Sequence, residues 1–171
     1  MDSANHKVKL TPGKAAIALV FVVICVVAYI ALALALAIEP FYPGFFFAFY
    51  FAGLKGGDLG EFPAAVAGSL GGLLVAALQH IPPEHFGTAG MVVALLVIVA
   101  AIYALLMEWA AIVINNAFML MLTVGTIPAV VKESAYLGMA ESVVLAAVFL
   151  WGLLQVAGLL TARAKRAVQS A

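Results

Sequence analysis

Residues 15–38 read AAIALVFVVICVVAYIALALALAI, an apolar run that contains no charged side chain. A membrane-spanning helix needs about 20 such residues, whereas the apolar core of a secretory signal has about 7–15. The run is therefore predicted to be a retained transmembrane helix. Its Cys25 is the only cysteine of the chain. It lies in mid-span, where it is expected to act as a small apolar residue.

The composition of the whole chain agrees with a membrane protein. Hydrophobic residues make up 67% of the 171 residues and charged residues 9%, against about 45–50% and 25% in soluble domains. We therefore expect an all-α, polytopic helix bundle with the lipid bilayer as its main partner. Lysine plus arginine and aspartate plus glutamate number 8 each. This balance argues against a nucleic-acid partner, which requires a basic face.

Glycine, proline and polar residues divide the chain into six apolar segments. Pro40 ends the first, and Pro82-Pro83 are expected to end the third. A turn is placed at Glu108-Trp109, because a carboxylate and an indole suit the membrane interface. The predicted segments are 15–38, 41–54, 64–81, 91–107, 110–131 and 137–160. Residues 1–14 and 161–171 are expected to flank this transmembrane domain, 15–160, as a cytoplasmic amino-terminal segment and a basic cytoplasmic tail.

The cationic residues predict the orientation. With the amino terminus in the cytoplasm, six crossings leave only Lys132 outside. The cations then inside are Lys7, Lys9, Lys14, Lys55, Arg163, Lys165 and Arg166. If segment 41–54 entered and left on one face, this agreement would be lost, so we expect a short crossing rather than a re-entrant loop.

The spacing of the segments is compatible with an internal repeat. Each half of the chain has three segments, and the middle segments, 41–54 and 110–131, are the irregular ones. Three is odd, so the halves would have opposite orientations, and such 3+3 inverted repeats with broken helices are typical of transporters with a solute path near the midplane. Any six-segment chain can be halved in this way, which remains the alternative explanation.

Asn115-Asn116 is the most informative polar pair, because an amide in hydrocarbon needs a hydrogen-bond partner. The pair could line a passage for a solute, or it could be an interhelical clamp that contributes about 0.6–2 kcal/mol. Thr123, in the same segment, could line the passage too or bond back to its own helix. Both interpretations stay open on the sequence alone.

Other side chains could line the same path. The aromatic run at 45–51 offers Phe46, Phe49 and Tyr50, which could instead face lipid and neighbouring helices. Glu141 could be a proton or cation site, or could be stabilised by the positive end of a helix. Gln155 lies deeper in the last segment and needs a partner.

The sequence does not predict an enzyme, a metal or a cofactor. His80 and His85 are separated by Pro82-Pro83, and no metal-ligand spacing or nucleophile–base set is recognisable. Gly68, Gly72 and Gly152 are expected to let helices approach closely, within one chain or between the subunits of a homo-oligomer.

One group of features is similar to a known family. Gly44-Phe45, Phe51, Gly53-Leu54-Lys55-Gly56 and the interrupted region 115–125 resemble the YcdZ-like family of small bacterial inner-membrane proteins. In that family the last region looks like a Pro-Gly turn, where this chain has Asn115-Asn116-Ala117. The resemblance implies the bacterial inner membrane and a channel-like or transporter-like function.

The leading hypothesis is therefore a small-solute channel or transporter with its path between the second and fifth segments. The alternative is a non-transporting accessory subunit of a larger membrane complex. The sequence does not identify the solute.

Overall fold

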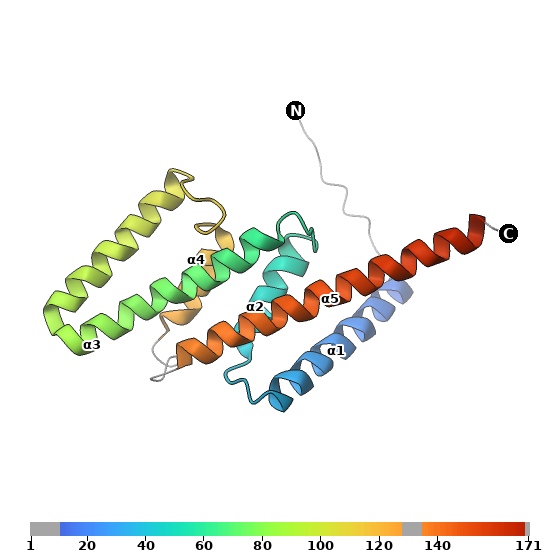
Figure 1. Cartoon of the computed structure of the whole chain (residues 1–171), viewed down its shortest axis with the longest axis horizontal. Coiled ribbons are helices and arrows are strands. Elements are labelled where there is room, and N and C mark those ends of the chain that lie inside the picture. Colours follow the sequence, from blue (N-terminus) through green and yellow to red (C-terminus); the bar gives the residue numbers. More distant parts are fainter. Residues whose placement is uncertain (1–10, 128–134, 170–171) are drawn as a thin grey trace.

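The computed structural model describes residues 11–127 and 135–169, and the part of the chain that it describes is helical and contains no strands. Lys7, Lys9 and Lys132 lie outside these residues. The elements in chain order are α1 (Pro12–Ala35), α2 (Tyr42–Ala48), the π-helix η1 (Phe49–Leu54), α3 (Phe62–Leu106), α4 (Asn116–Gly125) and α5 (Ala135–Gln169) (Figure 1).

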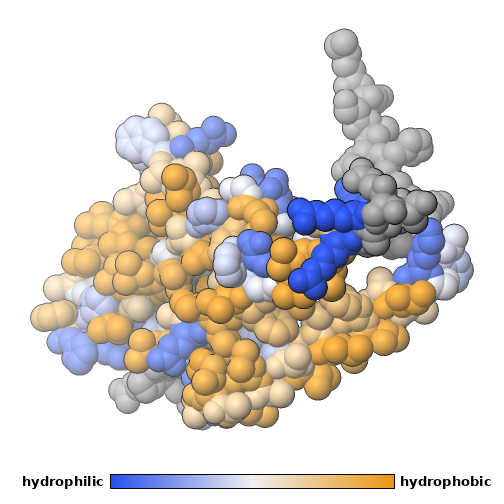
Figure 2. All heavy atoms as spheres, turned by 45° about the vertical axis from the view of Figure 1, so that its right-hand side comes forward, coloured by the Kyte–Doolittle hydropathy of each residue, from blue (hydrophilic) through white to orange (hydrophobic). Residues whose placement is uncertain are grey.

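Among the described residues, three helical stretches are long and apolar enough to cross a membrane. They are α1, α3 and the part Tyr136–Arg163 of α5. The surface is largely hydrophobic (Figure 2), as expected of a protein surrounded by lipid. These observations confirm the predicted all-α class and are typical of a membrane protein.

Helix α3 is bent into a hairpin. Gly87 interrupts it with φ 55° and ψ −130°, a conformation that glycine adopts without steric cost. The arms 62–86 and 88–106 then lie side by side, since Gln79 Nε2 donates to the Ala94 carbonyl at 2.8 Å (Figure 1). The prediction that Pro82-Pro83 end the helix was wrong. Each proline removes only one bond to the preceding turn, and the chain stays helical until Gly87.

The fifth predicted segment was too long. The chain leaves α3 at Met107 and turns through Glu108 and Ala110, which have φ values of 54° and 52°. Helix α4 then has only 10 residues, and the predicted residues 128–131 lie outside those described. The helix starts late because the Asn115 side chain accepts hydrogen bonds from the first free N–H groups and so fixes a helix start.

The short helices pack against the long ones. The α2–η1 segment packs on α5, and α4 packs on α3. The core between them contains Phe47, Phe51, Met121, Met139 and Val143, which are fully buried. Helix α1 is held more loosely, with only Tyr29 and Ala33 buried along its described length.

The two ends of the described chain lie on the same side of the molecule. In Figure 1 the start of α1 and the end of α5 lie at the right, and the loop 55–61 lies at the upper edge, at the end of the α2–η1 segment. The described cations Lys14, Lys55, Arg163, Lys165 and Arg166 belong to these three parts. The predicted basic tail continues α5 as helix as far as Gln169.

Candidate functional site

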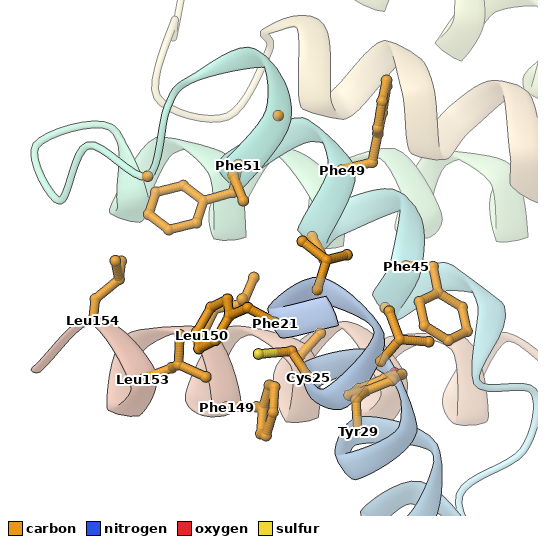
Figure 3. A pocket seen from close by; sticks show the side chains of 18 of the residues that line it. Phe21, Cys25, Tyr29, Phe45, Phe49, Phe51, Phe149, Leu150, Leu153 and Leu154 are labelled. Carbon is orange, nitrogen blue, oxygen red and sulfur yellow. The ribbon is translucent and has the colours of Figure 1, made fainter. Parts of the chain in front are cut away.

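A cavity of about 640 Å³ lies between α1, α2–η1 and α5 (Figure 3). Its walls are almost entirely apolar. The helices contribute Phe21 and Cys25 from α1, Phe45 and Phe49 from α2–η1, and Phe149 and Leu154 from α5. Figure 3 places the Cys25 side chain among Phe21, Phe149 and Leu150. The cavity can therefore hold an apolar group.

The cavity follows the length of the α2–η1 segment. Gly56 and Gly57 line it beyond the end of η1, and Tyr29 and Gly44 line it near the start of α2. The two elements have seven and six residues, which corresponds to about 20 Å at a rise of about 1.5 Å per residue. Gly56 and Gly57 have φ values of 65° and 71°, so glycine suits the turn that forms this mouth.

The opposite end of the cavity is closed by a group of polar atoms that we call the Tyr29–Ser142 node. The Tyr29 hydroxyl lies 2.9 Å from Ser142 Oγ and 3.1 Å from the Phe41 carbonyl oxygen. Ser142 Oγ donates to the Phe41 carbonyl at 2.9 Å and accepts from the Gly44 N–H at 2.9 Å. The node satisfies a free N–H group in the first turn of α2 and ties α1, α2 and α5 together.

Asn115 forms a second polar node, at the start of α4. Its Oδ1 accepts from the N–H groups of Ala117 at 2.9 Å and Phe118 at 3.2 Å. Its Nδ2 donates to the Ala64 carbonyl on α3 at 2.8 Å, and also to carbonyls of Ala111 and Ile112 in the preceding turn. Every polar atom of this side chain is thus occupied by backbone, which is the geometry of a helix cap and clamp.

The space between α2–η1 and α4 is filled in this conformation. Phe47 and Phe51 from one side, and Ala117 and Met121 from the other, are all 0% exposed and belong to one core cluster. The predicted path between the second and fifth segments would have to pass through this cluster. A solute path there requires a rearrangement of the helices.

The predicted path residues are dispersed. Phe49 lines the cavity, and Tyr50 is buried in the core at 5% exposure. The side chains of Phe46, Asn116, Thr123, Glu141 and Gln155 are exposed. Thr123 donates back to the Met119 carbonyl at 2.8 Å. Glu141 lies in the second turn of α5 rather than the first, because the helix begins earlier than expected, at Ala135.

The glycines predicted to mark close helix contacts differ from one another. A Cβ on Gly68 would meet the Asn115 side chain, and one on Gly72 would meet the Phe118 carbonyl and, at 2.9 Å, the Leu122 nitrogen. Gly152 has no neighbouring atom within 4 Å of that position. Positions 68 and 72 thus require glycine because α4 packs closely against them. Position 152 has no such neighbour within the chain.

Sequence reasoning did not find the Tyr29–Ser142 node. Tyr29 is a lone hydroxyl inside the apolar run 15–38, and Ser142 follows Glu141 in the last segment. A hydroxyl in each of two spans is a weak signal, since many such groups bond within their own helix. They are 113 positions apart in the sequence, so the pairing could not be inferred without the fold.

The histidines and the loop charges contribute little to this site. No group of three His, Cys, Asp or Glu side chains that could hold a metal ion occurs within residues 11–127 and 135–169. Lys55 Nζ lies 3.0 Å from Glu61 Oε2 at the mouth of the cavity. This hydrogen bond raises the pKa of Lys55 and keeps its charge paired.

The chain matches no protein-family model, no curated protein and no solved structure. Evidence on the function therefore comes from the cavity and the helix contacts of the chain itself.

Proposed function

We propose that this protein is a small-solute membrane transporter built from two inverted halves of three helical segments each. The halves are α1, α2–η1 and the first arm of α3, followed by the second arm of α3, α4 and α5. One observation carries the proposal: α2 packs on α5, the third helix of the other half, and α4 packs on Gly68 and Gly72 in the first arm of α3. The proposal includes six crossings with both ends in the cytoplasm, which the positions of the cations support, and a bacterial inner membrane, which the resemblance stated above supports.

The two contacts correspond residue by residue. A shift of 74 positions relates Phe41 to Asn115, the residues that precede α2 and α4, and relates Gly68 to Ser142. Ser142 bonds to the Phe41 carbonyl, and Gly68 faces the Asn115 side chain. Corresponding positions are thus neighbours in both directions, through a hydrogen bond in one case and through close packing in the other. This correspondence supports an inverted repeat.

The two halves differ in how open they are. The cavity lies between α1, α2–η1 and α5, and the corresponding space lies between the second arm of α3, α4 and the first arm. That second space is filled by Ala76, Phe118 and Leu122, which are at most 4% exposed. In inverted-repeat transporters, exchange of the two arrangements opens the other face. The cavity is then the solute's access from the cytoplasmic side.

The solute path predicted between the second and fifth segments fits this scheme. The solute would pass along it when the open and the filled arrangement change places between the two halves. The core cluster of Phe47, Phe51 and Met121 separates the two spaces and acts as the closed gate. A solute with a large apolar segment is favoured, since nearly all of the cavity wall is apolar. Asn115 then acts as a clamp at the hinge of α4.

Cys25 provides the test, because it is the only cysteine and it lines the cavity. In intact cells and inside-out vesicles, we expect an uncharged maleimide, joined by a flexible linker to a membrane-impermeant charged group that stays outside the cavity, to label it from the cytoplasmic face only. In a Cys25→Ala background, Leu122→Cys and Val75→Cys place the thiol in the filled space. These variants are expected to react from the opposite face only.

Two results would overturn the proposal. Labelling of Cys25 by lipid-soluble reagents alone would mean that the cavity is a lipid-filled groove without access for a solute. Absence of labelling at both Leu122→Cys and Val75→Cys, in protein that migrates normally in size-exclusion chromatography, would mean that the second space never opens.

The second candidate function is a non-transporting accessory subunit, favoured by the exposed aromatic side chain of Phe46 and the loosely held α1. Purification in mild detergent separates the two. A homo-oligomer or monomer supports the transporter, and stoichiometric co-purification with an unlike membrane protein supports the accessory subunit.

A further inference from the structure

We infer that the cavity binds a single-chain anionic amphiphile, with its apolar tail between α1, η1 and α5 and its headgroup near the cations that follow the cavity mouth. The inference rests on the proposed function for the transport of this ligand, but its binding is argued independently. Two separate features of the molecule support it, the chemistry of the walls and the position of the charges.

The walls require an apolar ligand segment. Among the described residues that line the cavity, none carries a charge, and the polar groups at its closed end are already bonded to one another in the Tyr29–Ser142 node. An ion transferred into such a space would lose its hydration without compensation. A hydrocarbon chain would replace water against Phe21, Phe149 and Leu154 and gain the free energy of apolar burial.

The charges lie beyond the open end. Helices α1 and α5 run in opposite directions, with Tyr29 opposite Ser142 at the closed end and with Phe21 and Leu154 lining the more open part. Measured from the Tyr29–Ser142 contact at about 1.5 Å per residue, Lys14 lies about 22 Å along α1 and Arg163 about 32 Å along α5. Both cations thus lie beyond the residues that line the cavity, at heights that differ by about 10 Å, and both are exposed.

Lys165 and Arg166 extend the same cationic group by one further turn of α5, and both are exposed. On the face shown in Figure 2, which is largely hydrophobic, hydrophilic side chains gather beside a hollow at this end, and smaller hydrophilic groups lie elsewhere. The remaining described charges nearby are in the loop 55–61, where Lys55 pairs with Glu61 and Asp58 accepts from the Gly60 N–H. Four cations, Lys14, Arg163, Lys165 and Arg166, thus stand against the carboxylate of Asp58, so the net charge of the described residues above the mouth is positive.

A hydrocarbon tail that starts in the cavity can place its headgroup near Lys14, and the headgroup that fits there is a carboxylate or a phosphate. Both anions bind lysine and arginine by charge-assisted hydrogen bonds. A free fatty acid and a lysophospholipid share this chemistry, and separate arms of the experiment distinguish them.

The experiment measures protection of Cys25 from N-ethylmaleimide in the full chain, reconstituted into phosphatidylcholine vesicles. Decanoate and lysophosphatidylglycerol are compared with decanol and lysophosphatidylcholine, which carry the same kind of tail without net negative charge. We expect the anionic compounds to protect at concentrations lower by about tenfold or more, given the attraction of several cations near one surface. Protection by only one anion identifies the source.

Two variants locate the headgroup and the tail. Replacing Lys14, Arg163, Lys165 and Arg166 together by glutamine is expected to remove the advantage of the anionic compounds, whereas Lys55→Gln, the matched control, keeps it. Cys25→Phe places a ring in the cavity and is expected to lose the amphiphile retained in native mass spectrometry, whereas Cys25→Ala retains it.

Equal protection by charged and uncharged compounds overturns the inference, and so does unchanged preference in the four-site variant. The outcome is separable from the proposed function. One-sided labelling of Cys25 without protection contradicts only the ligand, and protection without one-sided labelling contradicts only the transport.

Discussion

Asn115 and Asn116 are adjacent in the sequence but have different environments. The Asn115 carboxamide caps α4 and bonds to the Ala64 carbonyl of α3, while Asn116 is exposed. We expect Asn115→Ala to lower the free energy of unfolding by about 0.5–2 kcal/mol, the usual cost of losing a helix cap. Asn116→Ala is the matched control and should change it little. Thermal unfolding in detergent measures both.

The same pair separates a clamp from a path-lining role. If Asn115 is a clamp, its variant transports at the rate expected from its folded fraction. Lower flux by Asn116→Ala at unchanged stability would mean that the amide pair lines the solute path. It would contradict the assignment of the pair to a purely structural role.

Ser142 is fully buried, and its hydroxyl contacts the Tyr29 hydroxyl, the Gly44 N–H and the Phe41 carbonyl. Removal of its hydroxyl leaves the Gly44 N–H without its partner at 2.9 Å and the Tyr29 hydroxyl with fewer partners. Ser142→Ala is therefore expected to destabilise the protein by about 1–3 kcal/mol, the penalty for an unsatisfied buried group. Thr123→Ala, which loses only a bond within α4, is the control. An equal midpoint shift for the two variants would argue against the node.

At the scale of elements, the contact between α3 and α4 depends on small residues. A methyl group on Gly72 would meet backbone atoms of α4, which cannot move without shifting the helix. We expect Gly72→Ala to cost about 1–3 kcal/mol through overpacking. Gly152→Ala meets nothing within 4 Å and should be neutral or slightly stabilising, because alanine favours helix. Unfolding midpoints of the two variants, measured side by side, check the difference.

How much of this architecture the sequence predicts varies with the element. Helix α1 was predicted closely, because an uninterrupted apolar run leaves few alternatives. The length of α4 was not, since apolar residues at 110–114 look helical until Asn115 is seen to bond its own helix start. The hairpin in α3 was not predicted either. The helix continues past Pro82 and bends only at Gly87, where Gly90 packs against the Pro82 carbonyl.

The candidate site was harder to predict than the helices. The cavity lies between three elements that are distant in the sequence, and of the predicted path residues only Phe49 lines it. Its apolar walls have the same composition as a lipid-facing surface, so periodicity and hydropathy do not distinguish the two. Which apolar side chains face a cavity is decided by helix packing.

At the scale of the whole molecule, the crosswise contacts make the two halves depend on each other. The α2–η1 segment packs on α5, and α4 packs on the first arm of α3. A half expressed alone would leave the partner surface of its short helix uncovered, together with the Gly44 N–H or the Asn115 side chain. We therefore expect residues 1–87 and 88–171, produced separately, to be degraded or to aggregate in the membrane.

Co-expression of the same two fragments should restore a complex, because Gly87 lies in a turn where few other contacts depend on chain continuity. Purification through a tag on one fragment, followed by a test for the other, measures this. Ser142→Ala in one fragment should weaken the recovery more than Thr161→Ala, which loses only hydrogen bonds to carbonyls of its own helix. Stable accumulation of either fragment alone would mean that each half folds independently. The contacts between the halves would then not be needed for folding, which would argue against alternating access by exchange of these contacts.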